Sequence, residues 1–299
     1  MERQVFVSMT FDDYLTPTQN DVKWAIVDRI IGAGFMPHFF FPYIPAKYEG
    51  KVIAQSPWST DDVDRVIRNC VGAVMIGFPR WTISEERGEK LASDYTHYEA
   101  GIVHTLGLPM FMVLEEGIPW RGAFDGNTHN ICTILRNTDA ASLDKPSFSQ
   151  PFANWVTRVK GRKDIFLGYS SEAEGTAKNI ARLLSGYEAT VLDWKNFGPG
   201  TILEQIEDAA SRCSAGIFLF TNSDKLEGEG DRAAPRDNVV FEAGYFAHAK
   251  GHRRILIVRE AGAKMPADLG GAIYAPLADR SNIDPIAGQL ESFVKSLYS

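Results

Sequence analysis

The stretch DNVVFEAGYFAHAKGHRRILIVREAG, residues 237–262, decides the fold because it recurs earlier as DYTHYEAGIVHTLGLPMFMVLEEG, residues 94–117. Both stretches begin with Asp, reach a Glu-Ala-Gly triplet, continue as an apolar segment that contains His, and pass through Gly into an apolar run. The first part predicts a helix of mostly apolar character, and the second part predicts a buried strand. The chain therefore contains one helix–strand unit twice.

A second pair of segments repeats at the same distance. Residues 61–78 and 204–221 each read as a helical stretch, a Cys, a joint of small residues and an apolar run. Cys213 follows Cys70 by 143 positions, and Glu242 follows Glu99 by the same 143 positions. Two landmarks with one offset indicate a tandem repeat. We place one domain at residues 1–160 and a second at residues 161–299.

Strands and helices alternate within each copy. In the second copy, strands are predicted near residues 165–168, 189–192, 215–220 and 254–258, with helices between and after them. Continuous apolar strands separated by helices predict a parallel sheet covered on both faces, so each copy is expected to be a three-layer α/β domain. Ligands of such sheets bind at the carboxyl ends of the strands.

Composition excludes several classes of protein. The 299-residue chain has a formal net charge of −7 and only short basic stretches, so neither DNA nor RNA is expected as a partner. No apolar run reaches the length of a membrane span and the N-terminus does not read as a signal peptide, which predicts a cytoplasmic protein. Cys70, Cys132 and Cys213 are spaced neither like zinc ligands nor like a disulfide framework, and no metal site is predicted.

Glu242 is the candidate catalytic residue. It stands on an otherwise apolar helix, where a charge must be paired or must line a cleft, because burying it alone is costly. A carboxylate in a strand-end cleft suits N-glycosidic chemistry, in which it stabilises a cationic ribosyl group, acts as the nucleophile or holds the ribose hydroxyls. The structural alternative is a Glu bonded to backbone at the edge of the sheet.

Other segments of the second copy carry weaker signals. GYSSE, residues 168–172, offers two hydroxyls at a helix start, which suits a phosphate or serves as an ordinary cap. The turn at residues 196–200 presents Phe197, either for stacking or as a hydrophobic plug. The polar insert at residues 225–236 reads as a flap whose Arg236 could meet a phosphate, or as a plain solvated loop.

The second copy resembles the TIR-like (Toll/interleukin-1 receptor-like) domain of bacterial antiphage effectors linked to cyclic-nucleotide signalling. The matching segments are DIFLGYSSE, the run from DWKNFGPG to ASRC, FLFTNSD, PRDNVVFEAGYF and PADLGG, in the family's order. The resemblance implies a flavodoxin-like fold and hydrolysis of NAD to nicotinamide, with Glu242 essential, NAD as the substrate, and no cofactor. It places the substrate-binding residues at Tyr169, Ser170, Phe197, Asn222, Asp224 and Arg236. TNSD replaces the family's usual acidic turn, which puts Asn222 and Asp224 in doubt.

The first copy resembles the same superfamily more loosely and is also similar to nucleoside 2-deoxyribosyltransferases. Asp94 and Glu99 are its cleft candidates, and the aromatic run at residues 39–43 is read as a buried strand or as a wall for a base. A sensor that binds a nucleotide-like ligand and controls the second domain is the preferred interpretation, with a cyclic nucleotide or another activator and a homo-oligomeric active form. The alternatives are a nucleoside or nucleotide N-glycosidase or deoxyribosyltransferase, and a non-enzymatic TIR scaffold.

Overall fold

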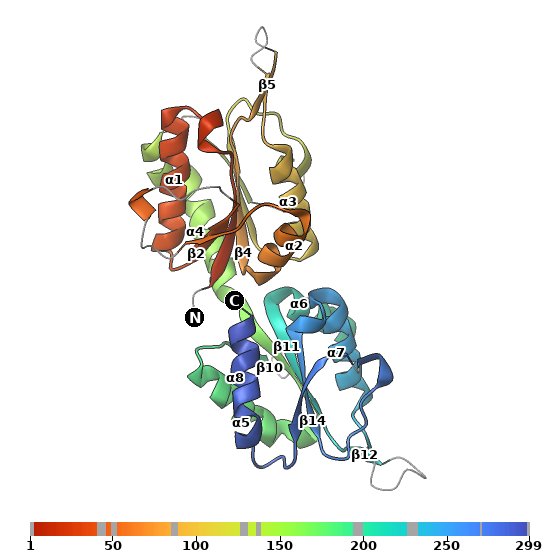
Figure 1. The fold of residues 1–299 in the computed structure, drawn as a ribbon. Coiled ribbons are helices and arrows are strands. Elements are labelled where there is room, and N and C mark those ends of the chain that lie inside the picture. Colours follow the sequence, from red (N-terminus) through yellow and green to blue (C-terminus); the bar gives the residue numbers. More distant parts are fainter. Residues whose placement is uncertain are drawn as a thin grey trace. The chain divides into compact units, whose positions relative to one another are not determined.

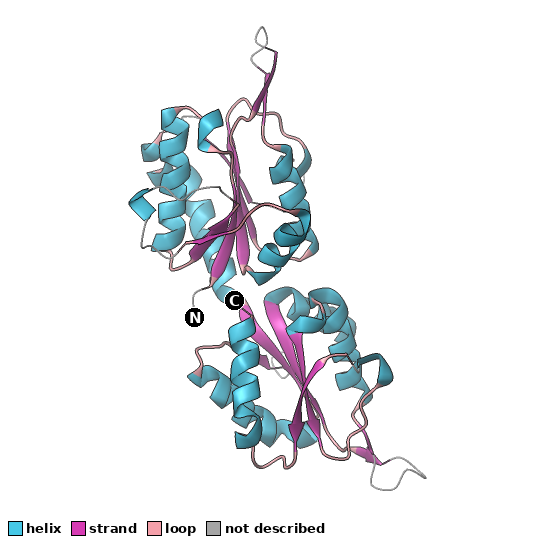
Figure 2. Ribbon diagram, in the orientation of Figure 1, coloured by secondary structure: helices cyan, strands magenta, loops and turns pink. Residues whose placement is uncertain are grey.

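Each half of the repeat folds as a parallel sheet covered by helices, so the predicted tandem α/β architecture is confirmed (Figures 1 and 2). The computed structural model describes residues 3–40, 46–48, 53–84, 89–125, 131–135, 139–193, 200–225, 233–269 and 271–297. Two compact units divide between Gly161 and Arg162. No helix in these ranges is long and apolar enough to cross a membrane.

The first unit contains a six-stranded parallel sheet in the order β3-β2-β1-β4-β7-β8. Its strands are β1 (Gln4–Ser8), β2 (Met36–Phe39), β3 (Ala54–Gln55), β4 (Gly72–Gly77), β7 (Met110–Glu115) and β8 (Ile131–Leu135). The helices are α1 (Pro17–Gly32), α2 (Thr60–Asn69), α3 (Asp94–Thr105) and α4 (Pro146–Gly161). A hairpin of β5 (Trp81–Ser84) and β6 (Glu89–Leu91) leaves the sheet between β4 and α3 (Figure 1).

The second unit contains a five-stranded parallel sheet in the order β10-β9-β11-β14-β15. Its strands are β9 (Lys163–Gly168), β10 (Val191–Asp193), β11 (Cys213–Phe220), β14 (Ile255–Glu260) and β15 (Ile273–Leu277). The helices are α5 (Glu174–Gly186), α6 (Ile202–Arg212), α7 (Asp237–Lys250) and α8 (Ala287–Ser296), and β12 (Asp224–Lys225) pairs with β13 (Ala233–Ala234). This strand order is the flavodoxin order, and the first unit adds β3 at one edge of it.

Two apolar clusters form the core of the second unit, one on each face of the sheet. One face packs against α5 and α8, and the other packs against α6 and α7. The apolar residues of α7 face the sheet, and the helix ends at Gly251, whose φ of 90° favours glycine. Local sequence thus fixes α7, and with it Glu242, over the strand ends.

The register of the two sheets is equivalent residue by residue. Ser8 of β1 lies opposite Met75 of β4, and Gly168 of β9 lies opposite Phe218 of β11. Met75 and Phe218 are themselves related by the 143-residue offset. Ser8 and Gly168 therefore occupy the same place in the two units, at the carboxyl end of the central strand.

Candidate functional site

The candidate site of the second unit lies where β9 and β11 end side by side. The strand order reverses at this pair, because β10 lies beyond β9 and β14 lies beyond β11. In open α/β sheets a ligand crevice forms outside the carboxyl ends of the strands at such a reversal. α7 packs against β11 at this position and brings Glu242 with it.

Glu242 is buried, with only 5% of its surface exposed, and its Oε2 atom has no hydrogen-bond partner among the described residues. Burial alone raises the pKa of this carboxyl to about 7, because water no longer stabilises the charged form. The structural alternative, a Glu tied to backbone, therefore does not apply to Oε2. A buried carboxyl oxygen without a donor is available to a ligand.

Gly168 makes the room that Glu242 occupies. A Cβ atom at this position would stand 2.6 Å from Glu242 Oε2 and 2.7 Å from Phe218 Cδ1. Both separations are shorter than side-chain contacts allow, so a larger residue would displace the carboxyl group or the ring. The Glu242 carboxyl group can therefore occupy its position only because the residue at the end of β9 has no side chain.

The two predicted residues that follow Gly168 lie differently. Tyr169 is buried in the core cluster on the α5 and α8 face, and its hydroxyl donates to the Asp193 carboxylate at 2.8 Å. Ser170 is buried, and its hydroxyl lies 3.3 Å from that of Thr221. The structure thus directs Tyr169 to the face opposite α7 and leaves Ser170 at the strand ends.

A network of charges joins the segments that follow β9, β11 and β15 to the end of β14 and the start of α7. Arg236, the N-cap residue of α7, donates to Glu172 at 3.2 Å, and Arg280 lies 3.9 Å from the same carboxylate. Arg280 also pairs with Glu260 at 2.7 Å, and the Asn222 backbone N–H donates to Glu260 at 2.7 Å. The structure therefore brings Arg236 and Asn222 into one polar cluster, which sequence reasoning missed because Arg280 and Glu260 carry no motif.

The remaining two predicted residues of the second unit are Asp224 and Phe197. Asp224 is the first residue of β12 and lies opposite Ala234 of β13. Phe197 lies outside the described residues.

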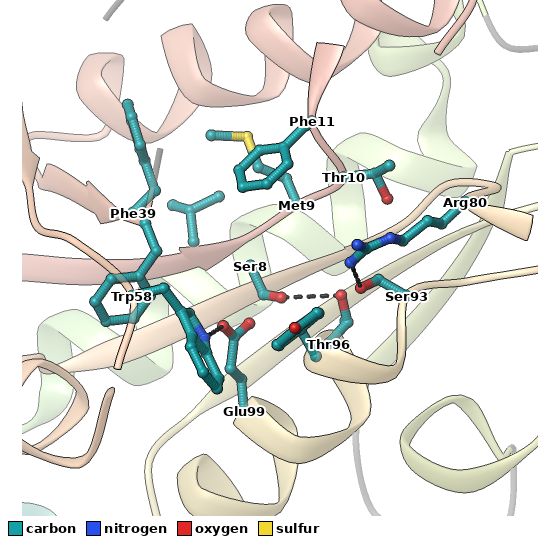
Figure 3. Close-up of a pocket in the computed structure, with 13 residues that line it drawn as sticks. Ser8, Met9, Thr10, Phe11, Phe39, Trp58, Arg80, Ser93, Thr96 and Glu99 are labelled. Carbon is teal, nitrogen blue, oxygen red and sulfur yellow. Dashed lines mark hydrogen bonds between the residues drawn. The ribbon is translucent and has the colours of Figure 1, made fainter. Parts of the chain in front are cut away.

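The equivalent glutamate of the first unit, Glu99 on α3, lies in a pocket of about 180 Å³ (Figure 3). It is 4% exposed, accepts a hydrogen bond from Trp58 Nε1 at 3.2 Å, and is also hydrogen-bonded by the Ser8 hydroxyl. Burial raises its pKa to about 7 against the lowering effect of these two bonds. Asp94, the other candidate, is exposed and lies 3.8 Å from Arg121, outside the lining of this pocket.

Sequence reasoning missed most of the residues that line the pocket, and Trp58 and Arg80 are the most important of them. Of the predicted aromatic run, Phe39 and Phe40 are buried and line the pocket, whereas residues 41–45 lie outside the described part. Trp58 precedes α2 and Arg80 follows β4, so both stand at the edge where strands end. Position directly after a strand was the signal that could have found Arg80.

Comparison with known proteins finds a family model that matches most of the second unit. Residues 164–279 match the family model described as CAP12/Pycsar effector protein, TIR domain. The predicted resemblance is confirmed for these residues, and the first unit lies outside this match.

Several curated relatives match part of the chain. The uncharacterized protein YuaY of Escherichia coli K12 is 34% identical over 128 residues, which cover 41% of this chain and 42% of that protein. The Pycsar effector protein BcPycTIR of Burkholderia cepacia is 29% identical over 156 residues, covering 48% and 51%. CD-NTase-associated protein 12 of a Lachnospiraceae bacterium is 30% identical over 139 residues, covering 44% of each. The matched region thus spans about half the length of these relatives.

Proposed function

We propose that the second unit cleaves NAD and releases nicotinamide, with the Glu242 carboxylate facing the ribose that carries the nicotinamide. The observation that carries this proposal is the buried Oε2 atom of Glu242, which has no donor in the described part of the chain. The match of residues 164–279 to an effector TIR domain supports it.

The proposed reaction breaks the bond between nicotinamide nitrogen and ribose C1′. The bonding electrons leave with nicotinamide, positive charge develops on the ribosyl group, and water adds to C1′ with loss of a proton. An ionised Glu242 beside this ribose stabilises the charge, and the same carboxylate could form a covalent intermediate or hold the hydroxyls. NAD is consumed as the substrate.

We further propose that the protein acts as an antiphage effector under the control of assembly or a nucleotide signal. The matching relatives, a Pycsar effector and a CD-NTase-associated protein, support this context. Association of copies predicts that nicotinamide release rises more than linearly with protein concentration or on adding an activator. Full activity that is strictly linear down to low concentration would contradict control by assembly.

The test is to incubate the purified protein with NAD and to measure free nicotinamide by chromatography. Glu242→Gln keeps the size of the side chain but removes the charge, so it should abolish release. Glu207→Gln on α6 is the matched control, because Glu207 is exposed on a neighbouring helix. Equal release by wild type and Glu242→Gln would refute the site.

A second candidate function is favoured by one observation, the pocket around Glu99. A nucleoside N-glycosidase or deoxyribosyltransferase would place its substrate there. The same incubation with deoxynucleosides in place of NAD tests it, because free base would then appear and would depend on Glu99.

A further inference from the structure

The pocket of the first unit lies at the reversal of its strand order, between β1 and β4 and beneath the start of α3. Its floor is formed by Ser8 at the end of β1 and by Glu99, and its rim includes Thr10, Arg80 and Ser93 (Figure 3). The crevice is therefore in the position that α/β sheets use for ligands. The chemical character of the lining side chains changes along the pocket, and this change determines which class of ligand the pocket can bind.

One end of the pocket carries positive charge. The Arg80 guanidinium donates to the Ser93 hydroxyl at 3.1 Å, and its Nε atom is buried without a hydrogen-bond partner among the described residues. No carboxylate in the described ranges pairs with Arg80. A guanidinium that is held in place but not neutralised is the group that binds a phosphate.

Arg80 is held in place by aromatic rings. Its guanidinium lies 5.2 Å from the centre of the Tyr14 ring, 5.0 Å from Trp81 and 5.1 Å from Tyr95. These contacts fix the direction of the side chain without consuming its hydrogen-bond donors. The guanidinium donors that Ser93 does not use stay available to an anion.

The other end of the pocket is aromatic. Phe39 and Phe40 line the pocket at this end, and the Trp58 ring lies beside Glu99 (Figure 3). Exposed rings continue this wall around the mouth, because Trp58 contacts Tyr95 at 4.8 Å and Tyr98 at 6.5 Å between ring centres. Exposed aromatic rings beside a cavity form a stacking surface for a flat ligand.

Between these ends lie groups that match hydroxyls. Glu99 offers carboxyl oxygens, and the Ser8 hydroxyl lies 3.0 Å from that of Thr96 (Figure 3). All three are buried, so a ligand hydroxyl that reaches them would do so away from water. The order along the pocket is a stacking surface, then hydroxyl-binding groups, then a cation.

We propose that this pocket binds a mononucleotide, with the base against Trp58, the ribose over Glu99 and the phosphate on Arg80. The pocket of about 180 Å³ is smaller than the roughly 300–1,000 Å³ of typical ligand sites, so it would enclose the ribose and part of the nucleotide while the base lies against the exposed rings at the mouth. The proposal concerns the first unit, and it does not depend on NAD cleavage by the second.

Titration calorimetry on the full chain tests the proposal with four nucleoside 5′-monophosphates, their 3′,5′-cyclic forms, the free nucleosides and ribose 5-phosphate. At least one mononucleotide should bind at least about tenfold more tightly than its nucleoside and than ribose 5-phosphate, because stacking and charge pairing each contribute. Comparing the linear with the cyclic forms shows whether the pocket prefers a terminal 5′-phosphate or a cyclic phosphodiester.

Variants assign the binding to the pocket. Arg80→Gln should weaken the mononucleotide about tenfold and leave the nucleoside unchanged, and Trp58→Ala should weaken both. Arg68→Gln is the matched control, since Arg68 is an exposed arginine of the same unit that pairs with Asp64 on α2. Thermal melting checks that each variant is folded.

No binding at millimolar ligand, or equal binding by folded wild type, Arg80→Gln and Trp58→Ala, would overturn the proposal. Nicotinamide release without added mononucleotide, measured on the same preparations, reports on the second unit and should be the same for wild type and for the control Arg68→Gln. Loss of mononucleotide binding is therefore readable separately from loss of NAD cleavage.

Discussion

Glu99 and Glu242 occupy the same position in the two units, yet their neighbours differ. Both are buried, and burial raises the pKa of both to about 7. Glu99 meets the donors Trp58 and Ser8, whereas Gly168 stands in the place of Ser8 beside Glu242. By the 143-residue offset, Val239 also replaces Thr96.

The difference teaches that one topology can prepare a carboxyl group in two ways. The first unit surrounds it with donors and a formed pocket, which favours recognition of hydroxyls. The second unit buries it without a donor to Oε2 among the described residues, which leaves that oxygen to the substrate. The predictions that follow test this contrast.

Among substitutions at the neighbours of the two glutamates, the largest effect is expected from Gly168→Ala. The added Cβ would collide with Glu242 Oε2 and the Phe218 ring, so NAD cleavage should fall at least about tenfold and stability by roughly 1–3 kcal/mol. Gly175→Ala on α5 is the control, because no atom lies within 4 Å of its added Cβ. Nicotinamide release and chemical denaturation check the pair, and a fully active Gly168→Ala would contradict the packing argument.

Glu242→Gln should change how stability depends on pH. The carboxyl pKa is raised from 4.5 to about 7 on folding, so the wild type loses stability as pH rises from about 4.5 to 7. The neutral Gln avoids this loss, and the variant should be more stable than wild type at pH 8 by on the order of 2 kcal/mol. Denaturation at pH 5 and pH 8 measures it, and an equal difference at both values would refute the buried charge.

Glu99→Gln extends the same comparison. It should show a similar gain between pH 5 and pH 8, because the pKa of Glu99 is raised to a similar value. At pH 5, however, it should be less stable than wild type by about 1 kcal/mol, since an amide replaces an oxygen that neighbouring donors use. No such loss is expected for Glu242→Gln.

The pH profile of NAD cleavage should follow Glu242. If the ionised carboxylate stabilises the ribosyl cation, kcat/KM should rise about tenfold between pH 6 and pH 8 and then level off. A rate that falls over this interval would show that the protonated form is required. Steady-state rates in a series of buffers of constant ionic strength provide the measurement.

The smallest effect is expected from Trp58→Phe. The hydrogen bond from Trp58 lowers the pKa of Glu99, so its removal should raise that pKa further, while the pKa of Glu242 stays unchanged. Carbon NMR titration of the glutamate side chains follows both groups. A lowered pKa for Glu99 would show that Trp58 acts mainly by excluding water.

Much of the fold was predictable from the sequence because each helix and strand of the two similar halves is marked by a pattern of neighbouring residues. The shared offset, the apolar strands and the helix around Glu242 are all written in contiguous residues. β15 was missed because its short run IYAPL contains Pro276, and a proline removes a backbone donor and argues against a strand.

The site was less predictable because its members are brought together by tertiary structure. Tyr169 was grouped with Gly168 as a neighbour in sequence, but successive residues of a strand point to opposite faces, and Tyr169 joins the other layer. Trp58 and Arg80 reach Glu99 from separate segments, so no spacing pattern connects them.

The central claim is that the two glutamates divide the work, with cleavage at Glu242 and recognition at Glu99. Nicotinamide release by wild type, Glu99→Gln and Glu242→Gln at equal, saturating protein and NAD concentrations tests it most directly. The account predicts a loss of about a hundredfold or more for Glu242→Gln and retained release for Glu99→Gln. Abolished release in a folded Glu99→Gln beside full release in Glu242→Gln would contradict it and place catalysis in the first unit.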